Sequence, residues 1–309
     1  MNKHTIEVKN LSVTYNNLLP TKDNFQALKD VTFTLEPGRI YGLIGRNGAG
    51  KTSLLSVLAS YRKASNGDVL INGQPLFDNG NFMQDIQFIY QKEFNTDNGE
   101  LYPKIRKYIK KETTYRPNFD MTYAEALIKK FGLPTNKRPN KLSKGMQSTL
   151  AVIIGLASRA PITIFDEAYL GMDAPTRDLF YKEVIKDQER HPRTIIMSTH
   201  LVSEMEYLFD EVIMIHKGEL LKKGTYDEIV SLGASVTGAA ESVDIFANGR
   251  NILNTEILGG FKKITLADGI TDKDRILAQD LDLEISTISL QDLFIHLTGG
   301  GNEFDETDR

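Results

Sequence analysis

A glycine-rich loop, GLIGRNGAGKTS at residues 42–53, constrains the fold of this chain more than any other stretch. It follows the apolar run RIYGLIG at 39–45, whose length suits a buried strand. It leads into KTSLLSVLASY at 51–61, where apolar residues recur at helical spacing. The sequence therefore predicts a strand, a tight glycine turn and a helix in immediate succession.

Glycines in this loop allow its backbone to approach a ligand closely. Backbone amides that converge at a helix N-terminus bind anions, and phosphate suits this arrangement best. The spacing fits G-x-x-x-x-G-K-[ST], in which Lys51 reaches the β- and γ-phosphates and Thr52 offers its hydroxyl to Mg²⁺. The alternative is a turn that only joins a strand to a helix. We expect a nucleotide to contact Gly45, Asn47, Gly48, Ala49, Gly50, Lys51, Thr52 and Ser53.

An acidic motif further along the chain supplies what hydrolysis requires beyond phosphate binding. In ITIFDE at 162–167, four apolar residues deliver Asp166 to the carboxyl end of a predicted strand. Asp166 is the expected metal carboxylate, and Glu167 is the candidate general base for a water molecule. The alternative is a solvated acidic pair that follows a strand.

Composition sets limits on the class of protein. The chain has 309 residues, which suits one large domain and a smaller one. Its apolar run LAVIIGLA at 150–157 is far shorter than the roughly 20 residues that cross a bilayer, so a membrane role would need a partner chain. Absence of cysteine excludes disulfides and thiolate sites. The net charge of −4 gives no reason to expect nucleic-acid binding. The first residues carry no secretory signal pattern, and we expect a cytoplasmic protein.

Secondary-structure patterns predict two domains. Short strands fill the first 75 residues, helices dominate from about 95 to 155, and strands and helices then alternate, which predicts a mixed sheet with an antiparallel β subdomain and a helical insertion. Composition changes near residue 232, so we expect a main domain over 1–232, a small α/β domain over 233–298 and a disordered tail over 299–309. The small domain should contain strands SVDIF, FKKITLA and LDLEIST and the helix SLQDLFIHL.

Taken together, these motifs resemble the nucleotide-binding subunits of ATP-binding cassette (ABC) transporters over residues 3–230. The resemblance implies a P-loop NTPase fold of the ABC ATPase type. LSKGM at 142–146 stands about twenty residues before Asp166, where that family carries L-S-G-G-Q. Lys144 and Met146 depart from this pattern, whereas Ser143 and Gly145 are kept. The resemblance implies that Ser143 and Gly145 contact the γ-phosphate bound to a second protomer.

Four further positions match the family in order. By resemblance, Tyr15 stacks on adenine, and Gln91 at the end of IQFIYQ meets Mg²⁺ and the attacking water. His200 at the end of IIMSTH matches the histidine that contacts the γ-phosphate, and Asp173 matches a residue of the loop that crosses the dimer interface. Ala168 stands where the family often has proline. Surface packing for Tyr15, a polar strand end for Gln91 and a structural role for His200 are the alternatives.

The implied mechanism is a head-to-tail dimer, of this chain or with a second ABC ATPase, that closes on two ATP molecules with Mg²⁺. Within the family, the short carboxyl domain resembles ATPases of bacterial ABC-2-type exporters, and LSKGM and FDEAYLGMD resemble the subgroup around YtrB and the phenol-soluble modulin exporter. The resemblance implies a separate multi-spanning transmembrane subunit and a place on the inner face of the cell membrane. An importer ATPase, or a soluble ABC ATPase acting on ribosomes or DNA, is the alternative.

Overall fold

The computed structural model describes residues 4–15, 24–91, 102–267 and 269–299. The chain packs into two compact units, one of residues 1–200 with 207–221 and the other of 201–206 with 222–309. These two units are defined by their internal contacts, and neither of them begins or ends at residue 232. The domain boundary near residue 232 stays a prediction. The tail over 299–309 lies outside the described residues except for Gly299.

A six-stranded sheet in the described residues forms the centre of the first unit. Its strand order is β10-β9-β3-β8-β7-β6, and β3 pairs in parallel with β8 and β9, as β7 does with β6 and β8. Parallel pairing gathers the carboxyl ends of these strands at one edge. The strands are β3 (Ile40–Ile44), β6 (Ile86–Tyr90), β7 (Ile162–Asp166), β8 (Thr194–Thr199), β9 (Glu211–His216) and β10 (Glu219–Thr225).

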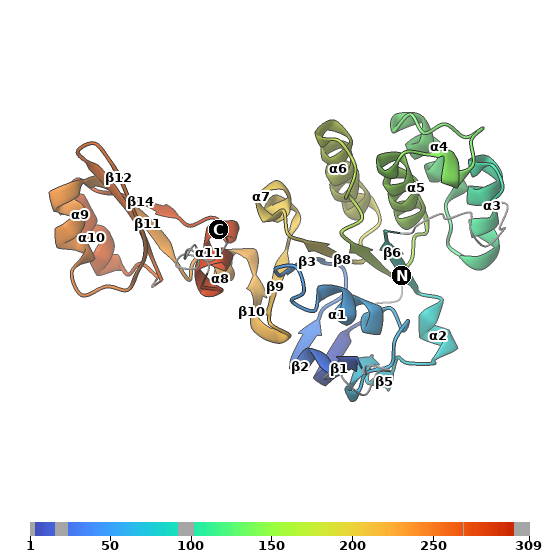
Figure 1. The fold of residues 1–309 in the computed structure, drawn as a ribbon, viewed down its shortest axis with the longest axis horizontal. Coiled ribbons are helices and arrows are strands. Elements are labelled where there is room, and N and C mark those ends of the chain that lie inside the picture. Colours follow the sequence, from blue (N-terminus) through green and yellow to red (C-terminus); the bar gives the residue numbers. More distant parts are fainter. Residues whose placement is uncertain (1–3, 16–23, 92–101, 268, 300–309) are drawn as a thin grey trace, which may run out of the picture. The chain divides into compact units, whose positions relative to one another are not determined.

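An antiparallel sheet covers one side of this centre. Its order is β2-β1-β4-β5, and α1 (Lys51–Leu58) contributes four buried apolar side chains to the core that both sheets share. Figure 1 shows α1 between the two sheets. A short α2 (Gly80–Met83) precedes β6. The strands are β1 (Ile6–Tyr15), β2 (Phe25–Leu35), β4 (Asn66–Ile71) and β5 (Gln74–Pro75).

Helices cover the opposite face of the six-stranded sheet. Figure 1 shows α5 and α6 on that face, with α3 and α4 beyond α5. Helix α5 is the most apolar of them, and its buried residues pack on β6 and β7. Of these helices, α3, α4 and α5 occupy the segment predicted as the helical insertion, about 95–155, whereas α6 follows β7. The elements on this face are α3 (Ile105–Tyr115), α4 (Met121–Lys130), the 3₁₀ turn Pro139–Lys141, α5 (Lys144–Ala157) and α6 (Ala174–Arg190).

The second unit contains a four-stranded antiparallel sheet in its described residues. The order is β12-β13-β11-β14, with β11 (Ala234–Ala239), β12 (Ile252–Leu258), β13 (Phe261–Leu266) and β14 (Glu284–Thr287). Three short helices, α7 (Val202–Met205), α8 (Tyr226–Val230) and α11 (Leu290–Leu297), pack together. Helix α10 (Asp272–Asp280) contacts β14.

The predicted strand SVDIF is wrong, because this segment lies inside helix α9 (Ala240–Ala247). Val243, Phe246 and Ala247 are buried there against the small domain's core. Val243 lies three residues before Phe246 and four before Ala247, so the three side chains share one helical face. Within the five residues SVDIF alone, the apolar residues look like the alternation of a strand. FKKITLA and LDLEIST contain β13 and β14, and SLQDLFIHL contains α11.

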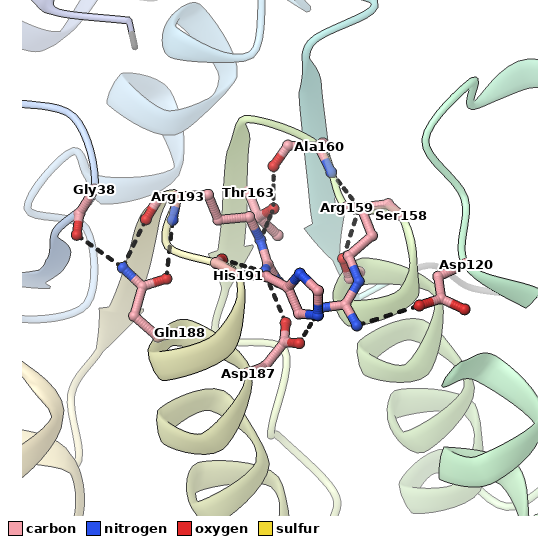
Figure 2. A network of polar contacts seen from close by, with 11 residues as sticks. Gly38, Asp120, Ser158, Arg159, Ala160, Thr163, Asp187, Gln188, His191 and Arg193 are labelled. Atoms are coloured by element: carbon pink, nitrogen blue, oxygen red, sulfur yellow. Dashed lines mark hydrogen bonds and ion pairs between the residues drawn. The ribbon is translucent and has the colours of Figure 1, made fainter. Parts of the chain in front are cut away.

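A buried polar network joins the helices to the amino ends of the parallel strands. Asp187 of α6 lies between Arg193, with Nη1 2.7 Å from Oδ2, and Arg159, which follows α5 (Figure 2). Arg159 also reaches Asp120, the residue that caps α4. Side chains of Arg193 and Asp187 are each 2% exposed. Burial lowers the pKa of Arg193, and the Asp187 carboxylate counteracts that effect.

No helix in the described part of the chain is both long and apolar enough to cross a membrane.

We predict that Asp187→Asn lowers the free energy of unfolding by about 3–5 kcal/mol, because it leaves the buried Arg193 without its carboxylate. Urea unfolding of the purified protein measures this loss. Asp178→Asn on the same helix is the matched control, because Asp178 and Lys182 form an ion pair with side chains 54% and 60% exposed. The control should unfold like wild type. Equal stability of both variants would contradict a structural role for the network.

Candidate functional site

The glycine loop connects β3 to α1 through backbone conformations that favour glycine. Gly48 and Gly50 have φ angles of 78° and 105°, in the left-handed region. A Cβ on Gly50 would lie 2.5 Å from the carbonyl oxygen of Ala27, and one on Gly45 would lie 2.8 Å from that of Ile215. The loop is therefore held between neighbouring strands, and it leads into the N-terminus of α1, where the first backbone amides of a helix lack helical partners.

Lys51, the first residue of α1, is buried although it carries a charge. Its Nζ donates to the carbonyl oxygen of Gly45 at 2.7 Å and lies 3.3 Å from Oε1 of Glu167. Burial without an acceptor would be costly for an ammonium group. The fold thus holds the Lys51 ammonium group in place against the glycine loop.

Asp166 and Glu167 leave the end of β7 in different directions. Asp166 is buried and accepts a hydrogen bond from the Ser198 hydroxyl at 2.6 Å. The same hydroxyl accepts one from the Glu167 amide at 2.9 Å. Glu167 has φ 46°, a left-handed conformation that is uncommon for a residue with a side chain. Ser198 thereby holds a strained turn that keeps one carboxylate inside and aims the other outward.

His200 completes a cluster of three ionisable side chains. It follows β8, the strand beside β7, and its Nδ1 lies 3.2 Å from Oε1 of Glu167. The same carboxylate oxygen therefore faces both Lys51 and His200. The imidazole is about one-third exposed, with a side-chain exposure of 36%. Three residues predicted from separate motifs meet here because their strands run parallel.

A cavity of ≈ 350 Å³ opens over the loop. This volume lies within the ~300–1,000 Å³ of common ligand sites. Of the described residues, the cavity is lined by Phe25, Ala27, Arg46, Asn47, Gly48, Ala49, Gly50, Lys51, Thr52, Ser53 and Glu167. All eight loop residues predicted to contact nucleotide except Gly45 are among them. Gly45 lies just inside, where its carbonyl oxygen accepts from Lys51.

The donors around this cavity suit a metal that arrives with its ligand. Among the described residues, no three His, Cys, Asp or Glu side chains gather to hold a metal ion by themselves. Thr52 offers an exposed hydroxyl, and Asp166 offers a buried carboxylate at the end of β7. Mg²⁺ commonly takes one or two protein ligands together with phosphate oxygens and water. The two side chains fit that pattern.

Gln91 and Tyr15 lie outside the lining of this cavity. Gln91 follows β6 and lines a different groove of ≈ 210 Å³, beside Tyr108 and Lys144. Tyr15 ends β1 and packs partly buried against the main core. Its hydroxyl lies 3.0 Å from the Ser53 hydroxyl. Tyr15 thus contacts the first turn of α1 without lining the cavity.

Ser143, Gly145 and Asp173 lie at the starts of two helices and not in the cavity. Ser143 caps α5 by accepting from the Met146 amide, and Asp173 caps α6 by accepting from the Thr176 amide at 3.0 Å. A Cβ on Gly145 would lie 2.3 Å from the carbonyl oxygen of Gly171. The two helix starts are therefore in backbone contact through a pair of glycines.

Sequence reasoning missed Ser198, which touches both acidic residues. Part of the signal was available, since Ser198 stands two residues before His200 in a segment where strands and helices are predicted to alternate. In the structure, Ser198 is the register partner of Asp166. Parallel register therefore identifies such a supporting residue once the strand order is known.

Comparison with known proteins places this site in a family. A family model described as ABC transporter matches residues 28–170. NatA of Bacillus subtilis (strain 168), an ABC transporter ATP-binding protein, is 30% identical over 227 residues, which are 66% of this chain and 84% of NatA. The chain belongs to the ABC transporter ATP-binding proteins.

Two further likenesses agree with this family. The ABC transporter ATP-binding protein YtrB of the same organism is 26% identical over 287 residues, covering 90% of this chain and 95% of YtrB. The dimeric post-hydrolysis structure of the ATP-binding cassette MJ0796 bound to ADP and Pi has a TM-score of 0.61. It is 21% identical and covers 72% of this chain and 98% of that one, a likeness of fold.

The chain is thus an ABC ATPase that hydrolyses ATP, with the predicted cassette fold. The mixed α/β core with its antiparallel subdomain confirms the fold class expected from the sequence. Cassettes of this family dimerise.

We predict that Gly50→Ala destabilises the protein more than Gly48→Ala. Both residues have positive φ, which costs a non-glycine residue roughly 1–2 kcal/mol. Only Gly50 would also drive its Cβ into a backbone carbonyl, because Gly48 has no neighbour within 4 Å of that position. Urea unfolding without nucleotide measures both losses. Equal losses would show that the Ala27 contact does not restrain the loop.

Proposed function

We propose that this chain is the ATP-driven subunit of a bacterial ABC exporter and powers a separate multi-spanning transmembrane subunit. The hydrolytic part of this proposal rests on Glu167. Its carboxylate contacts both Lys51 and His200 beside the phosphate-loop cavity. Its place would be peripheral, on the cytoplasmic face of the cell membrane. The transported substrate is a drug, an antimicrobial peptide or an amphipathic peptide.

Phosphate binding would rearrange the contacts of Lys51. Its Nζ is within 3.3 Å of the Glu167 carboxylate, and phosphate oxygens in the loop would compete for that ammonium group. Exchange of partners releases Glu167, which can then accept a proton from an in-line water as the general base. Lys51 meanwhile neutralises charge on the β- and γ-phosphates.

His200 and the metal donors complete the proposed machinery. His200 is partly exposed beside Glu167, so a modest shift of its side chain would allow it to donate to the γ-phosphate. Mg²⁺, held by the Thr52 hydroxyl and the Asp166 carboxylate, would neutralise charge on the phosphate oxygens. Ser198 keeps Asp166 oriented for this purpose by donating to Oδ1. Gln91, on the neighbouring strand end, would approach the metal from the groove side.

Each nucleotide would be enclosed by two cassettes. The N-terminus of α5 carries Ser143 as its cap and no acidic residue in its first turn, so it favours an anion. In a head-to-tail dimer, Ser143 and Gly145 of one cassette would face the nucleotide on the other, with Asp173 at the crossing. The second cassette is a copy of this chain or a different ABC ATPase. ATP bound between the two cassettes would hold the dimer closed, and hydrolysis would allow it to open.

The groove that contains Gln91 is the proposed site for the transmembrane subunit. It lies between β6 and helices α3 and α5, and it mixes aromatic with charged side chains. Tyr61, Tyr90 and Tyr108 supply apolar faces and Lys144 supplies a cationic group, while Arg116 is paired with Glu112 in the same lining. A cytoplasmic helix of the partner with acidic and apolar residues would fit this lining. Such docking would couple nucleotide state to the membrane through Gln91.

An importer ATPase is the alternative, since it uses the same hydrolytic residues. The exporter reading rests on the small size of the second unit and on its resemblance to ABC-2-type ATPases. Reconstitution of the complete complex into proteoliposomes distinguishes the two. Movement of an amphipathic peptide away from the cassette side supports export, whereas movement toward the cassettes contradicts it.

We predict that Glu167→Gln lowers ATPase turnover by at least about 100-fold while ATP binding is retained, because only the general base is lost. Phosphate release and isothermal titration with Mg-ATP measure the two quantities. Glu125→Gln on the exposed face of α4 is the matched control and should match wild type. Unchanged turnover in Glu167→Gln would show that this carboxylate is not the base.

We also predict that Ala151→Trp prevents co-purification of a membrane partner, because a large side chain would fill the groove that Ala151 lines. The comparison uses detergent-solubilised cells, Mg-ATP and the Glu167→Gln background. Ala239→Trp, at an exposed position of the second unit, should retain the partner. Recovery of ribosomal proteins or DNA without a membrane protein would contradict the transporter proposal and leave the ATPase intact.

A further inference from the structure

Charge is distributed unevenly along this chain. Residues 92–146 contain thirteen Lys and Arg residues and six Asp and Glu residues, a net charge of +7, whereas the whole chain carries −4. The rest of the chain therefore carries −11. Of the acidic residues in this segment, Glu112 and Asp120 already pair with Arg116 and Arg159. Positive charge is thus concentrated on the helical insertion.

Helix α3 separates its apolar and its basic residues onto two faces. Ile105 and Ile109, four residues apart, are buried. The opposite face carries four exposed cationic side chains at helical spacing, Arg106, Lys107, Lys110 and Lys111. Exposed Lys104 and Lys137 extend this surface, because the Lys137 carbonyl oxygen accepts a hydrogen bond from the Ile105 amide at 2.9 Å. We call these six cationic residues the α3 basic face.

The α3 basic face opposes the stability of its own helix. Lys107 lies three residues before Lys110 and four before Lys111, and like charges at this spacing destabilise a helix. The first turn of α3 has no acidic residue and the last turn no basic one, whereas the helix dipole favours both. Within the described residues, none of the six cations forms an ion pair. An external polyanion would relieve this repulsion.

The same helix forms a wall of the groove proposed for the transmembrane subunit. Tyr108 and Glu112 line that groove. Figure 1 shows α3 at the outer side of the helices, beyond α5. Tyr115, four residues after Lys111, is 74% exposed, and exposed tyrosines are enriched where proteins meet the membrane–water interface. A membrane subunit seated in the groove would therefore bring α3 near the bilayer.

We propose that the α3 basic face binds the anionic headgroups of the lipid bilayer beside the transmembrane subunit. The inference rests on the proposed place at the membrane and adds a lipid contact to the protein contact. Anionic headgroups attract clustered Lys and Arg residues, and each one near the surface adds to binding. Five of the six residues are lysines, whose ammonium groups bind phosphates as point charges without requiring one fixed geometry.

The acidic remainder of the chain would give this contact a direction. A net charge of −11 outside residues 92–146 would be repelled by the same anionic bilayer that attracts the α3 basic face. Only one face of the cassette would then approach the lipid. The groove for the membrane subunit borders that face, so lipid binding would orient the cassette for docking.

Sedimentation of the purified full chain with lipid vesicles tests the proposal. The vesicles contain phosphatidylcholine alone, or phosphatidylcholine and phosphatidylglycerol in equal amounts. We expect binding to the mixed vesicles only, and weaker binding at about 1 M salt, where the screening length is about 3 Å. An α3 variant that combines Arg106→Gln, Lys107→Gln, Lys110→Gln and Lys111→Gln should lose at least about 100-fold in vesicle affinity.

A matched control removes the same number of charges elsewhere. It combines Lys186→Gln, Arg190→Gln, Lys222→Gln and Lys273→Gln, which change exposed residues away from α3. The control should bind mixed vesicles within about threefold of wild type, because screened charges act locally. ATPase turnover should be unchanged in both variants, since neither set lines the phosphate-loop cavity. The α3 variant should resist urea at least as well as wild type, because repulsion within α3 is reduced.

Four results would overturn the proposal. Equal binding of wild type to both kinds of vesicle would show that anionic headgroups are not recognised. Equal losses in the two variants would assign binding to net charge and not to this face. Binding of duplex RNA or DNA without binding of vesicles would assign the face to nucleic acid. A wild-type chain that binds no anionic vesicle and still co-purifies with a membrane protein would contradict the lipid contact alone and leave the transporter proposal intact.

Discussion

Parallel pairing of β3, β8 and β7 is the constraint on which the site depends. These strands come from distant parts of the chain, yet their pairing brings Ile44, Thr199 and Asp166 to one edge of the sheet. Everything beyond that edge is loop or helix start, where backbone amides and polar side chains are free to meet a ligand. The glycine loop, the acidic pair and the histidine follow directly from these three strand ends.

Sequence patterns predict much of this arrangement because each motif carries its own local structure. An apolar run before the glycine loop and another before Asp166 indicate buried strands, and parallel topology then requires their ends to meet. The antiparallel subdomain and the helical insertion could be expected in this way, and the cassette fold from the resemblance of the motifs to a known family. The small domain was harder, since SVDIF is too short to distinguish helical from strand spacing, and its burial on β11 and β13 decides the outcome.

Side-chain environments could not be predicted from the motifs. Tyr15 and Phe25 are both aromatic residues near a strand end, and nothing in the sequence says that Arg62 covers one and that the other stays exposed. Ser198 is similar, because a hydroxyl inside an apolar strand has no special meaning until the register places it beside Asp166. Buried charges such as Asp187 and Arg193 also depend on partners contributed by different elements.

The contact between Gly145 and Gly171 has a consequence for how the protein can change over time. A side chain at Gly145 would need space that the Gly171 carbonyl occupies, so the start of α5 and the turn before α6 cannot diverge separately. The two segments carry Ser143 and Asp173, which we place at the boundary with a second cassette. A substitution in one of these segments would therefore require a compensating substitution in the other, even though more than twenty residues of sequence separate them.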